Sequence, residues 1–208
     1  MNEIQEFEKN LGYLGQDLIK SIIDNSKILE AAKDTELVKE GQYIKYIPIM
    51  LKGLVKVTTR LADKELLLYY IKPYESCVMS FSASLKNEKS KIYATTEEDS
   101  TVILIPSDMV LKWINQYPLI NRLFYQQYNL RYLDLIETIN QLLYLKLDQR
   151  LYEYLKEKNK ITGKNPYAIS HREIALELGT AREVVTRILK KLEKENKIRQ
   201  LKEGILVL

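Results

Sequence analysis

The spacing of apolar residues changes twice along this chain of 208 residues. Within residues 3–27 apolar side chains recur three or four positions apart, which predicts one or two short amphipathic helices (Ile4, Phe7, Leu11, Leu14, Leu18 and Ile22). Between residues 28 and 105 the pattern shortens to brief runs of β-branched, leucine and tyrosine residues. After Pro106 the helical spacing returns, so a β-rich stretch is predicted between two helical ones.

The middle stretch predicts a small all-β unit. Turn-forming clusters that contain Gly41, Gly53 and Pro73 separate its apolar runs. Many short strands at close spacing are typical of a sandwich or a small barrel. The expected strands are residues 37–38, 46–51, 54–58, 66–71, 92–95 and 101–105.

A long helix is predicted over residues 117–145, after a shorter helix with Ser107 as its expected N-cap and Asp108 in its first turn. At 1.5 Å per residue the long helix spans roughly 40 Å. Its apolar stripe is Leu119, Leu123, Leu130, Leu133, Ile136, Ile139, Leu142 and Leu143, flanked by Tyr125, Tyr128, Tyr132 and Tyr144. Such a helix needs a cover beyond the sheet, either another part of its own chain or the same helix of a second subunit. We favour the second subunit.

The last part of the chain predicts two short helices joined by a tight turn. A helix over residues 147–158 and a polar loop over residues 159–166 lead into it. Ser170 and Glu173 form a capping box that starts the first short helix, Gly179 suits the turn, and Thr180 with Glu183 predicts a second capping box. The apolar residues that two crossing helices would bury are Ile174, Ala175, Leu178, Val185, Ile188 and Leu189. Residues 197–201 and 204–208 predict a β-hairpin, so the unit is interpreted as a winged helix-turn-helix.

The second short helix carries the candidate chemistry. Arg182 and Arg187 lie five residues apart, about 140° around the helix, so their side chains can reach neighbouring base pairs. An arginine fork matches the O6 and N7 atoms of guanine, and the Glu183 carboxylate can accept from cytosine N4. Glu183 alternatively only caps its helix. Lys190, Lys191, Lys194 and Lys197 are either phosphate contacts or a solvated face.

Charge and composition narrow the function classes. Residues 146–208 hold 15 Lys and Arg against 9 Asp and Glu, a net +6, whereas residues 1–145 hold 17 against 19, a net −2. Clustered positive charge favours a polyanionic partner, although solvated helices that bind nothing often carry it too. One histidine, one cysteine and no Gly-rich phosphate loop leave little from which to build an active site, so no enzyme is expected.

Other classes of site and location are also constrained. Cys77 alone cannot form an intrachain disulfide, a four-thiolate cluster or a structural zinc site, and it is interpreted as a small buried hydrophobe. The N-terminus contains acidic residues and no apolar core of signal length, and no stretch approaches the roughly 18–20 apolar residues of a membrane span. A cytoplasmic protein without a membrane partner is expected.

These features resemble the Crp/Fnr family of bacterial transcription regulators over nearly the whole chain. The strongest local match is GTAREVVTRILK at residues 179–190, which is similar to the family motif G-x-S-R-E-T-V-x-R-x-L. The resemblance implies a homodimer that reads an inverted repeat of TGTGA-like half-sites in double-stranded DNA, with RNA polymerase as a candidate partner. The implied DNA-binding residues are Ser170, His171, Thr180, Arg182, Glu183, Arg187 and Lys190. Ala181 and Val184 replace the usual serine and threonine, which puts neighbouring phosphate contacts in doubt.

The resemblance also bears on the effector. Family members that bind cyclic AMP carry a Gly-Glu pair and, about ten residues later, an Arg-Ser or Arg-Thr pair. Val78-Met79 and Ser90-Lys91 occupy these places, so a cyclic phosphate would lack its arginine and cyclic AMP is not expected to bind. No cofactor is predicted, and the effector stays unidentified. Cys77, Ser80 and Tyr93 are the expected lining of the effector pocket.

The sequence as a whole predicts an α+β protein in three parts. Residues 1–116 form a sensor β-roll of the double-stranded β-helix or jelly-roll type, residues 117–145 a dimerisation helix, and residues 146–208 a winged helix-turn-helix DNA-binding domain. The expected function is that of a sequence-specific transcription regulator. The alternative is a β-roll that binds a small molecule and whose DNA-binding domain is not its main output.

Overall fold

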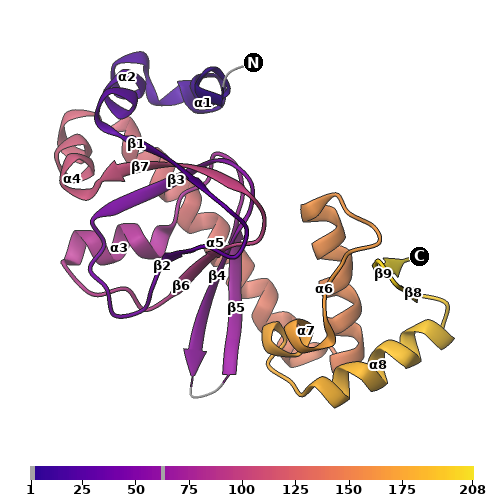
Figure 1. Cartoon of the computed structure of the whole chain (residues 1–208). Helices are drawn as coiled ribbons and strands as arrows, with labels where there is room; N and C mark the ends of the chain where they lie inside the picture. Colours follow the sequence, from indigo (N-terminus) through magenta and orange to yellow (C-terminus); the bar gives the residue numbers. More distant parts are fainter. Residues whose placement is uncertain (1–2, 62–63) are drawn as a thin grey trace. The chain divides into compact units, whose positions relative to one another are not determined.

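The computed structural model describes residues 3–61 and 64–208, which divide into two compact units (Figure 1). The first unit combines the chain up to Thr59 with Leu68–Asp134, and the second combines Arg60–Leu67 with Leu135–Leu208. Each unit has buried apolar cores of its own. No helix within the described residues is long and apolar enough to cross a lipid bilayer.

Two β-sheets form the centre of the first unit. The first has the strand order β1-β7-β3 and the second the order β2-β6-β4-β5. The pairings of β1 and β3 with β7, and of β2 and β4 with β6, are antiparallel. The strands are β1 (Lys27–Ala31), β2 (Glu36–Val38), β3 (Tyr46–Lys52), β4 (Val55–Leu61), β5 (Lys64–Ile71), β6 (Tyr93–Thr96) and β7 (Ser100–Pro106).

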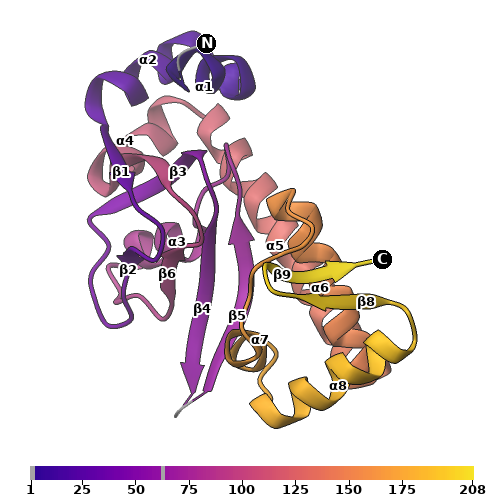
Figure 2. The same ribbon diagram turned by 45° about the vertical axis from the view of Figure 1, so that its right-hand side comes forward.

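Strands β3 and β7 of the three-stranded sheet are buried on both faces. Along β7, Val102 belongs to a core shared with the four-stranded sheet, whereas Ile103 and Ile105 point to the other side. On that side they meet Phe7 and Trp113 of the helices that Figures 1 and 2 show gathered beside β1, β3 and β7. These helices are α1 (Glu3–Leu11), α2 (Gln16–Asn25) with the 3-10 turn η1 (Gly12–Leu14), α4 (Ser107–Gln116) and the first half of α5 (Leu119–Tyr144).

The α+β fold with a β-rich domain, a long helix and a C-terminal helix-turn-helix is confirmed, and each of the six expected strands matches an observed one. Two elements were missed. Strand β1 buries only Ala31, so its pattern carries no alternation. Helix α3 (Val78–Lys86) begins with Cys77 as N-cap, whose Sγ accepts from the Ser80 amide at 3.4 Å. Cysteine is not among the residues that signal a helix start.

The helix boundaries need two corrections. Helix α4 begins at Ser107 itself with Pro106 as N-cap, so Ser107 is not the capping residue, although Asp108 does lie in the first turn. Helix α6 (Leu147–Thr162) runs through the start of the expected loop, and Gly163, which is left-handed at φ +66°, is its C-cap. The side chains of Leu142, Leu143 and Tyr144 in the expected stripe of α5 lie outside the described residues.

The second unit is built on one apolar core. Besides α6 it contains α7 (His171–Glu177), α8 (Arg182–Lys194) and the hairpin of β8 (Ile198–Leu201) with β9 (Gly204–Val207). Every one of these elements contributes to the core, whose buried residues are Leu151, Tyr154, Leu155, Ile174, Ala175, Val185, Ile188, Leu189, Leu192, Ile198 and Ile205. The expected winged helix-turn-helix is thus confirmed. The apolar residues whose spacing predicted two crossing helices belong to this core or pack against it.

Candidate nucleic-acid interface

Helix α7 starts with the capping box that the sequence predicts. The Ser170 hydroxyl accepts from the Glu173 amide at 3.1 Å, and the Glu173 carboxylate accepts from the Ser170 amide at 2.8 Å. Ile174 and Ala175 are buried one turn further on, where α8 packs against α7. The capping box therefore fixes where α7 begins, and with it the place at which α8 can cross.

The turn between α7 and α8 corrects the second expected capping box. Gly179 is left-handed at φ +65°, its amide bonds to the Leu176 carbonyl at 3.2 Å, and the Thr180 amide bonds to the Ala175 carbonyl at 2.9 Å. This pair of bonds is a Schellman motif, so Thr180 completes the end of α7. Ala181 takes the N-cap position of α8 and offers no side-chain hydrogen bond. Glu183 consequently does not form a capping box with Thr180.

One face of α8 is buried and the opposite face is exposed. Val185, Leu189 and Leu192 lie in the core, which fixes the rotation of the helix about its axis. The side chains of Arg182, Glu183, Arg187 and Lys190 are exposed, and Thr186 is half-buried. In Figures 1 and 2 α8 lies along the outside of the second unit. The helix therefore presents a polar, mainly basic face outward.

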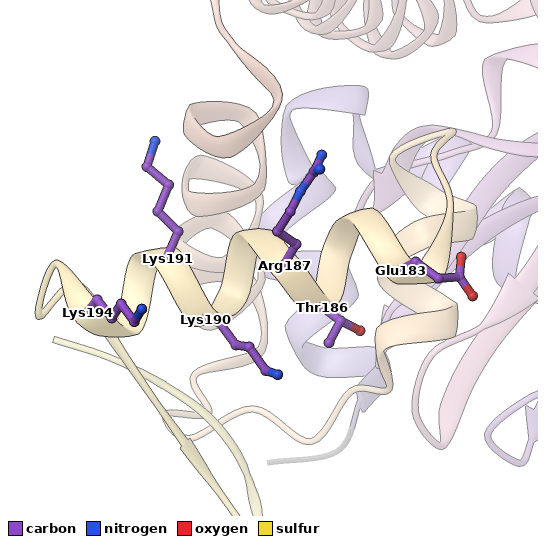
Figure 3. A pocket seen from close by; sticks show the side chains of 6 residues that line it. All are labelled: Glu183, Thr186, Arg187, Lys190, Lys191 and Lys194. Carbon is purple, nitrogen blue, oxygen red and sulfur yellow. The ribbon is translucent and has the colours of Figure 1, made fainter.

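An open groove follows this face of α8. It is lined by Glu183, Thr186, Arg187, Lys190, Lys191 and Lys194. Figure 3 shows Arg187 and Lys191 on one flank of the helix, Thr186 and Lys190 on the other, and Glu183 near its N-terminal end. Within residues 3–61 and 64–208 the side chains of Arg182, Glu183 and Arg187 form no ion pair. Their charged ends are thus open to a partner.

Lys191, in contrast, is held within the unit. Its ammonium group contacts the Asp148 carboxylate and lies 3.7 Å from Glu195 Oε1. The hydrogen bond from Lys191 holds the pKa of the Asp148 carboxyl below its usual value. Lys197 is paired with Glu195 at 2.7 Å. Of the four lysines that the sequence left open, Lys190 and Lys194 are therefore the better candidates for phosphate contacts.

The wing is fixed to the loop that precedes α7. Tyr167 pairs with Ile205 in an antiparallel bridge, and the Asn165 side chain both donates to the Val207 carbonyl and accepts from the Val207 amide, each at 2.9 Å. Gly204 has φ +144°, and a Cβ there would lie 2.3 Å from the Tyr167 carbonyl oxygen. Only glycine permits this close approach.

His171 lies between the two helices and the wing. Its Nδ1 is 2.9 Å from the Thr186 hydroxyl of α8, and its Nε2 is 3.2 Å from Gln200 Oε1 of β8. Gln200 in turn donates to the Glu193 carboxylate of α8 from both its amide groups, at 2.8 Å from the backbone and 3.0 Å from the side chain. Of the expected DNA-binding residues, the structure thus brings His171 beside α8, and Arg182, Glu183, Arg187 and Lys190 onto the exposed face of that helix, whereas Ser170 caps the start of α7 and Thr180 completes its end.

A buried ion pair in the second unit was not anticipated. Lys158 Nζ lies 3.3 Å from Glu177 Oε2 with side chains only 1% and 4% exposed, and the Tyr154 hydroxyl donates to the same carboxylate oxygen at 2.8 Å. The ammonium group also lies over the Tyr154 and Tyr167 rings, 5.8 and 5.6 Å from their centroids. The pair connects α6, α7 and the loop before α7. The spacing of Leu151, Tyr154, Leu155 and Lys158 on α6 was the signal, because it places the lysine on the buried face.

The residues expected to line an effector pocket lie in the first unit. Cys77 and Ser80 are 0% and 1% exposed, and Tyr93 is half-buried on β6. Cys77 borders an apolar cavity of about 10 Å³ together with residues that include Met50, Val55 and Ile71, which leaves space for about one water molecule. Ser80 and Tyr93 are not among the residues that line this cavity.

Polar contacts around Cys77 connect it to α5. The Tyr69 hydroxyl lies 3.8 Å from Cys77 Sγ, and burial raises the pKa of Tyr69 well above its usual value. The Arg131 guanidinium lies over the Tyr69 ring, pairs with Glu75 at 2.6 Å and donates to the Tyr70 carbonyl at 2.9 Å. No group of three or more metal-ligating side chains occurs among the described residues.

Comparison with known proteins gives a domain match and a fold match. Residues 139–208 match the family model of the Crp-like helix-turn-helix domain. No curated protein matches the sequence significantly.

Solved structures match nearly the whole chain. A protein described as a transcriptional regulator of the Crp/Fnr family from Eubacterium rectale ATCC 33656 superposes with a TM-score of 0.82 at 22% identity, over 93% of this chain and 90% of that one. The c-di-GMP-responsive global regulator CLP of Xanthomonas campestris gives 0.80 at 18% identity, over 92% and 98%. A CRP/FNR-family transcriptional regulator of Thermus thermophilus gives 0.67 at 19% identity, over 88% and 93%.

Proposed function

We propose that this chain is a transcription regulator of the Crp/Fnr type and that it reads an inverted repeat in DNA as a homodimer. The proposal is supported by the match of residues 139–208 to the Crp-like helix-turn-helix domain and by the fold that the chain shares with solved Crp/Fnr regulators. Helix α8 enters the major groove and presents Arg182, Glu183 and Arg187 to base edges.

The observation that carries this proposal is the outward face of α8. The three side chains are exposed and have no ion pair among the described residues, while the apolar face of the same helix is fixed in the core. A solvated helix face usually carries acidic and basic residues that pair with one another, as Lys191 does with Asp148 and Glu195. An unpaired carboxylate between two arginines would be repelled by phosphates, which favours contact with a base edge.

A second exposed stripe, on α5, supports the homodimer. Tyr125, Tyr128, Tyr132, Leu135 and Ile139 are spaced alternately three and four residues apart, and they are 75%, 40%, 62%, 56% and 44% exposed. This alternation is the heptad spacing with which two parallel helices pack. Three tyrosines that the sequence analysis placed beside the apolar stripe thus form the N-terminal part of this exposed stripe. A second copy of α5 would remove these side chains from water.

Replacing Leu135 by glutamate is expected to dissociate the homodimer. The twofold axis would bring the two new carboxylates close together, and each subunit would also lose the apolar contacts of Leu135. Sedimentation equilibrium should give twice 24.4 kDa for the wild type and 24.4 kDa for Leu135→Glu. Leu111→Glu is the matched control, since Leu111 is an exposed leucine (41%) on α4, outside the stripe. A monomeric wild type, or an intact Leu135→Glu dimer, would contradict the assigned stripe.

Selection from a pool of randomised duplexes tests the proposed function itself. The full-length protein should enrich an inverted repeat of TGTGA-like half-sites whose centres lie about one helical turn apart, roughly 34–36 Å, as two recognition helices related by a twofold axis require. Arg182→Ala/Arg187→Ala should enrich nothing above the pool. Enrichment of a non-repeated motif, or of none by the wild type, would sink the proposal.

We propose further that cyclic AMP is not the effector. Val78, in the expected Gly-Glu place, is 2% exposed at the start of α3. In the expected Arg-Ser place the Ser90 hydroxyl donates to the Ile92 carbonyl at 3.0 Å and accepts from the Ile92 amide at 3.2 Å. These places therefore offer neither the arginine fork nor the ribose carboxylate that would hold a cyclic nucleotide.

A further inference from the structure

His171 joins three elements of the DNA-binding unit through one ring. It occupies the first position of α7, contacts Thr186 of α8 through Nδ1, and contacts Gln200 of β8 through Nε2. It is also the only histidine in the sequence, and histidine is the side chain whose ordinary pKa, near 6.5, lies between pH 5 and 8. A protonation change in this range can therefore act on the recognition helix and the wing together.

The neighbours of the ring fix where its protons lie. Glu193 Oε2 can only accept, so the Gln200 side-chain amide 3.0 Å away must donate to it, and Gln200 Oε1 then faces His171. Since Oε1 is an acceptor, Nε2 of His171 must carry a proton. On the other side, the Thr186 hydroxyl donates to the Arg182 carbonyl at 3.0 Å and is left to accept from Nδ1.

With Thr186 bonded in this way, donation from both ring nitrogens requires the imidazolium form. A neutral ring with its proton on Nε2 keeps the Nδ1 contact only if Thr186 turns its proton away from the Arg182 carbonyl. The cationic ring keeps every bond in the chain from Arg182 through Thr186, His171 and Gln200 to Glu193.

We propose that His171 is a positioning residue whose protonated form holds the wing and the first turn of α8 in the geometry that binds DNA, so that affinity for DNA rises as His171 is protonated. This inference rests on the proposed function, because it assigns a role within the same interface. The chain of hydrogen bonds from Arg182 through Thr186, His171 and Gln200 to Glu193 is called the relay below. Arg182 is the proposed base-reading residue at its end, since the Arg182 carbonyl accepts the last hydrogen bond.

Charged groups of both signs surround His171. Glu193 of α8 lies one residue beyond Gln200 in the hydrogen-bond chain, and Lys202 and Glu203 of the wing turn line a groove together with His171. On its own helix, Arg172 is adjacent and the Glu173 carboxylate is bonded to the Ser170 amide. Phosphates of bound DNA add negative charge. If DNA binds the protonated form more tightly, as proposed, linkage requires its affinity to fall as the pH rises.

The affinity of the full-length protein should be measured between pH 5.5 and 8.0 at constant ionic strength, on a TGTGA-like inverted repeat and on a scrambled duplex of equal composition. Between pH 8.0 and pH 5.5 the affinity of the wild type should rise roughly tenfold, or about threefold for each of two subunits, which is near the low end for a single hydrogen bond. His171→Gln should show a flat profile. Thr186→Val should lose at least half of the gain.

Thr162→Val is the matched control for Thr186→Val. The Thr162 hydroxyl makes the same type of bond within its helix, to the Lys158 carbonyl at 2.7 Å, but lies at the end of α6. This variant should keep the wild-type pH profile. A His171→Gln profile as steep as that of the wild type would overturn the proposal.

The protonation state itself is measured on the free protein by NMR, where a single histidine gives one set of ring nitrogen signals. Two protonated ring nitrogens at pH 6, converting at higher pH to the tautomer with its proton on Nε2, support the relay. A neutral ring at pH 6, or a proton on Nδ1 alone at higher pH, would overturn it. If neither duplex is preferred at any pH, the proposed function fails. The NMR signals of the His171 ring, and their change in Thr186→Val, still show whether the proposed hydrogen-bond chain exists in the free protein.

Discussion

Full-length protein carrying Glu177→Ala is expected to lose about 3–5 kcal/mol of stability in its second unit, because the change leaves the Lys158 ammonium buried without its carboxylate. Lys158 is 1% exposed and cannot reach water without opening the packing between α6 and α7. The Tyr154 hydroxyl loses its acceptor in the same step. Slow hydrogen exchange at the amides of Leu155, Ile174 and Leu189 reports the opening of this unit alone.

Two companion variants separate the ion pair from general damage. Lys158→Met/Glu177→Leu replaces both partners by apolar side chains of similar size and should recover most of the loss, since it leaves no charge behind. Glu203→Ala removes an exposed carboxylate of the same unit and should change stability by no more than about 0.5 kcal/mol. Equal protection in Glu177→Ala and the wild type would show that Lys158 does not depend on Glu177.

The sequence predicted the architecture because the architecture follows from apolar periodicity. Ile174, Val185 and Leu189 have the spacing of two crossing helices, and all three are buried. Residues 102–105 lie in β7, the mostly buried central strand of its sheet, and their continuous apolar run was enough to identify that strand. Local hydrogen bonding was harder to predict. Thr180 has the residue type of an N-cap, yet its amide completes the end of α7.

The candidate interface was predicted in part. Placing Arg182, Glu183 and Arg187 on an exposed face needed only the helical period and the position of the core. The contacts of His171 needed more, because Thr186 lies 15 residues away and Gln200 lies 29 residues away. Their pairing depends on how the wing folds back on α8. Of the expected stripe of α5, Leu130, Leu133, Ile136 and Ile139 are exposed, whereas Leu123 is buried, because a sequence does not show which part of the helix faces the first unit's own core.

Arg182→Ala is expected to weaken operator binding by about 1–3 kcal/mol per half-site and to relax the choice of base at one position of each half-site. The loss is base-specific because an arginine fork donates to O6 and N7 of guanine together, a pattern that no other base pair offers in the major groove. Lys194→Ala is the matched control, since Lys194 is an exposed basic residue at the far end of α8. It should weaken binding about equally on every sequence and reduce the salt dependence.

The most direct measurement is the affinity of the wild type, Arg182→Ala and Lys194→Ala for the selected inverted repeat and for each of its single base-pair substitutions. The predicted result is a base preference that Arg182→Ala loses at one symmetry-related pair of positions and Lys194→Ala keeps everywhere. An Arg182→Ala protein that binds every substituted duplex more weakly by the same factor would contradict the reading of base edges by α8.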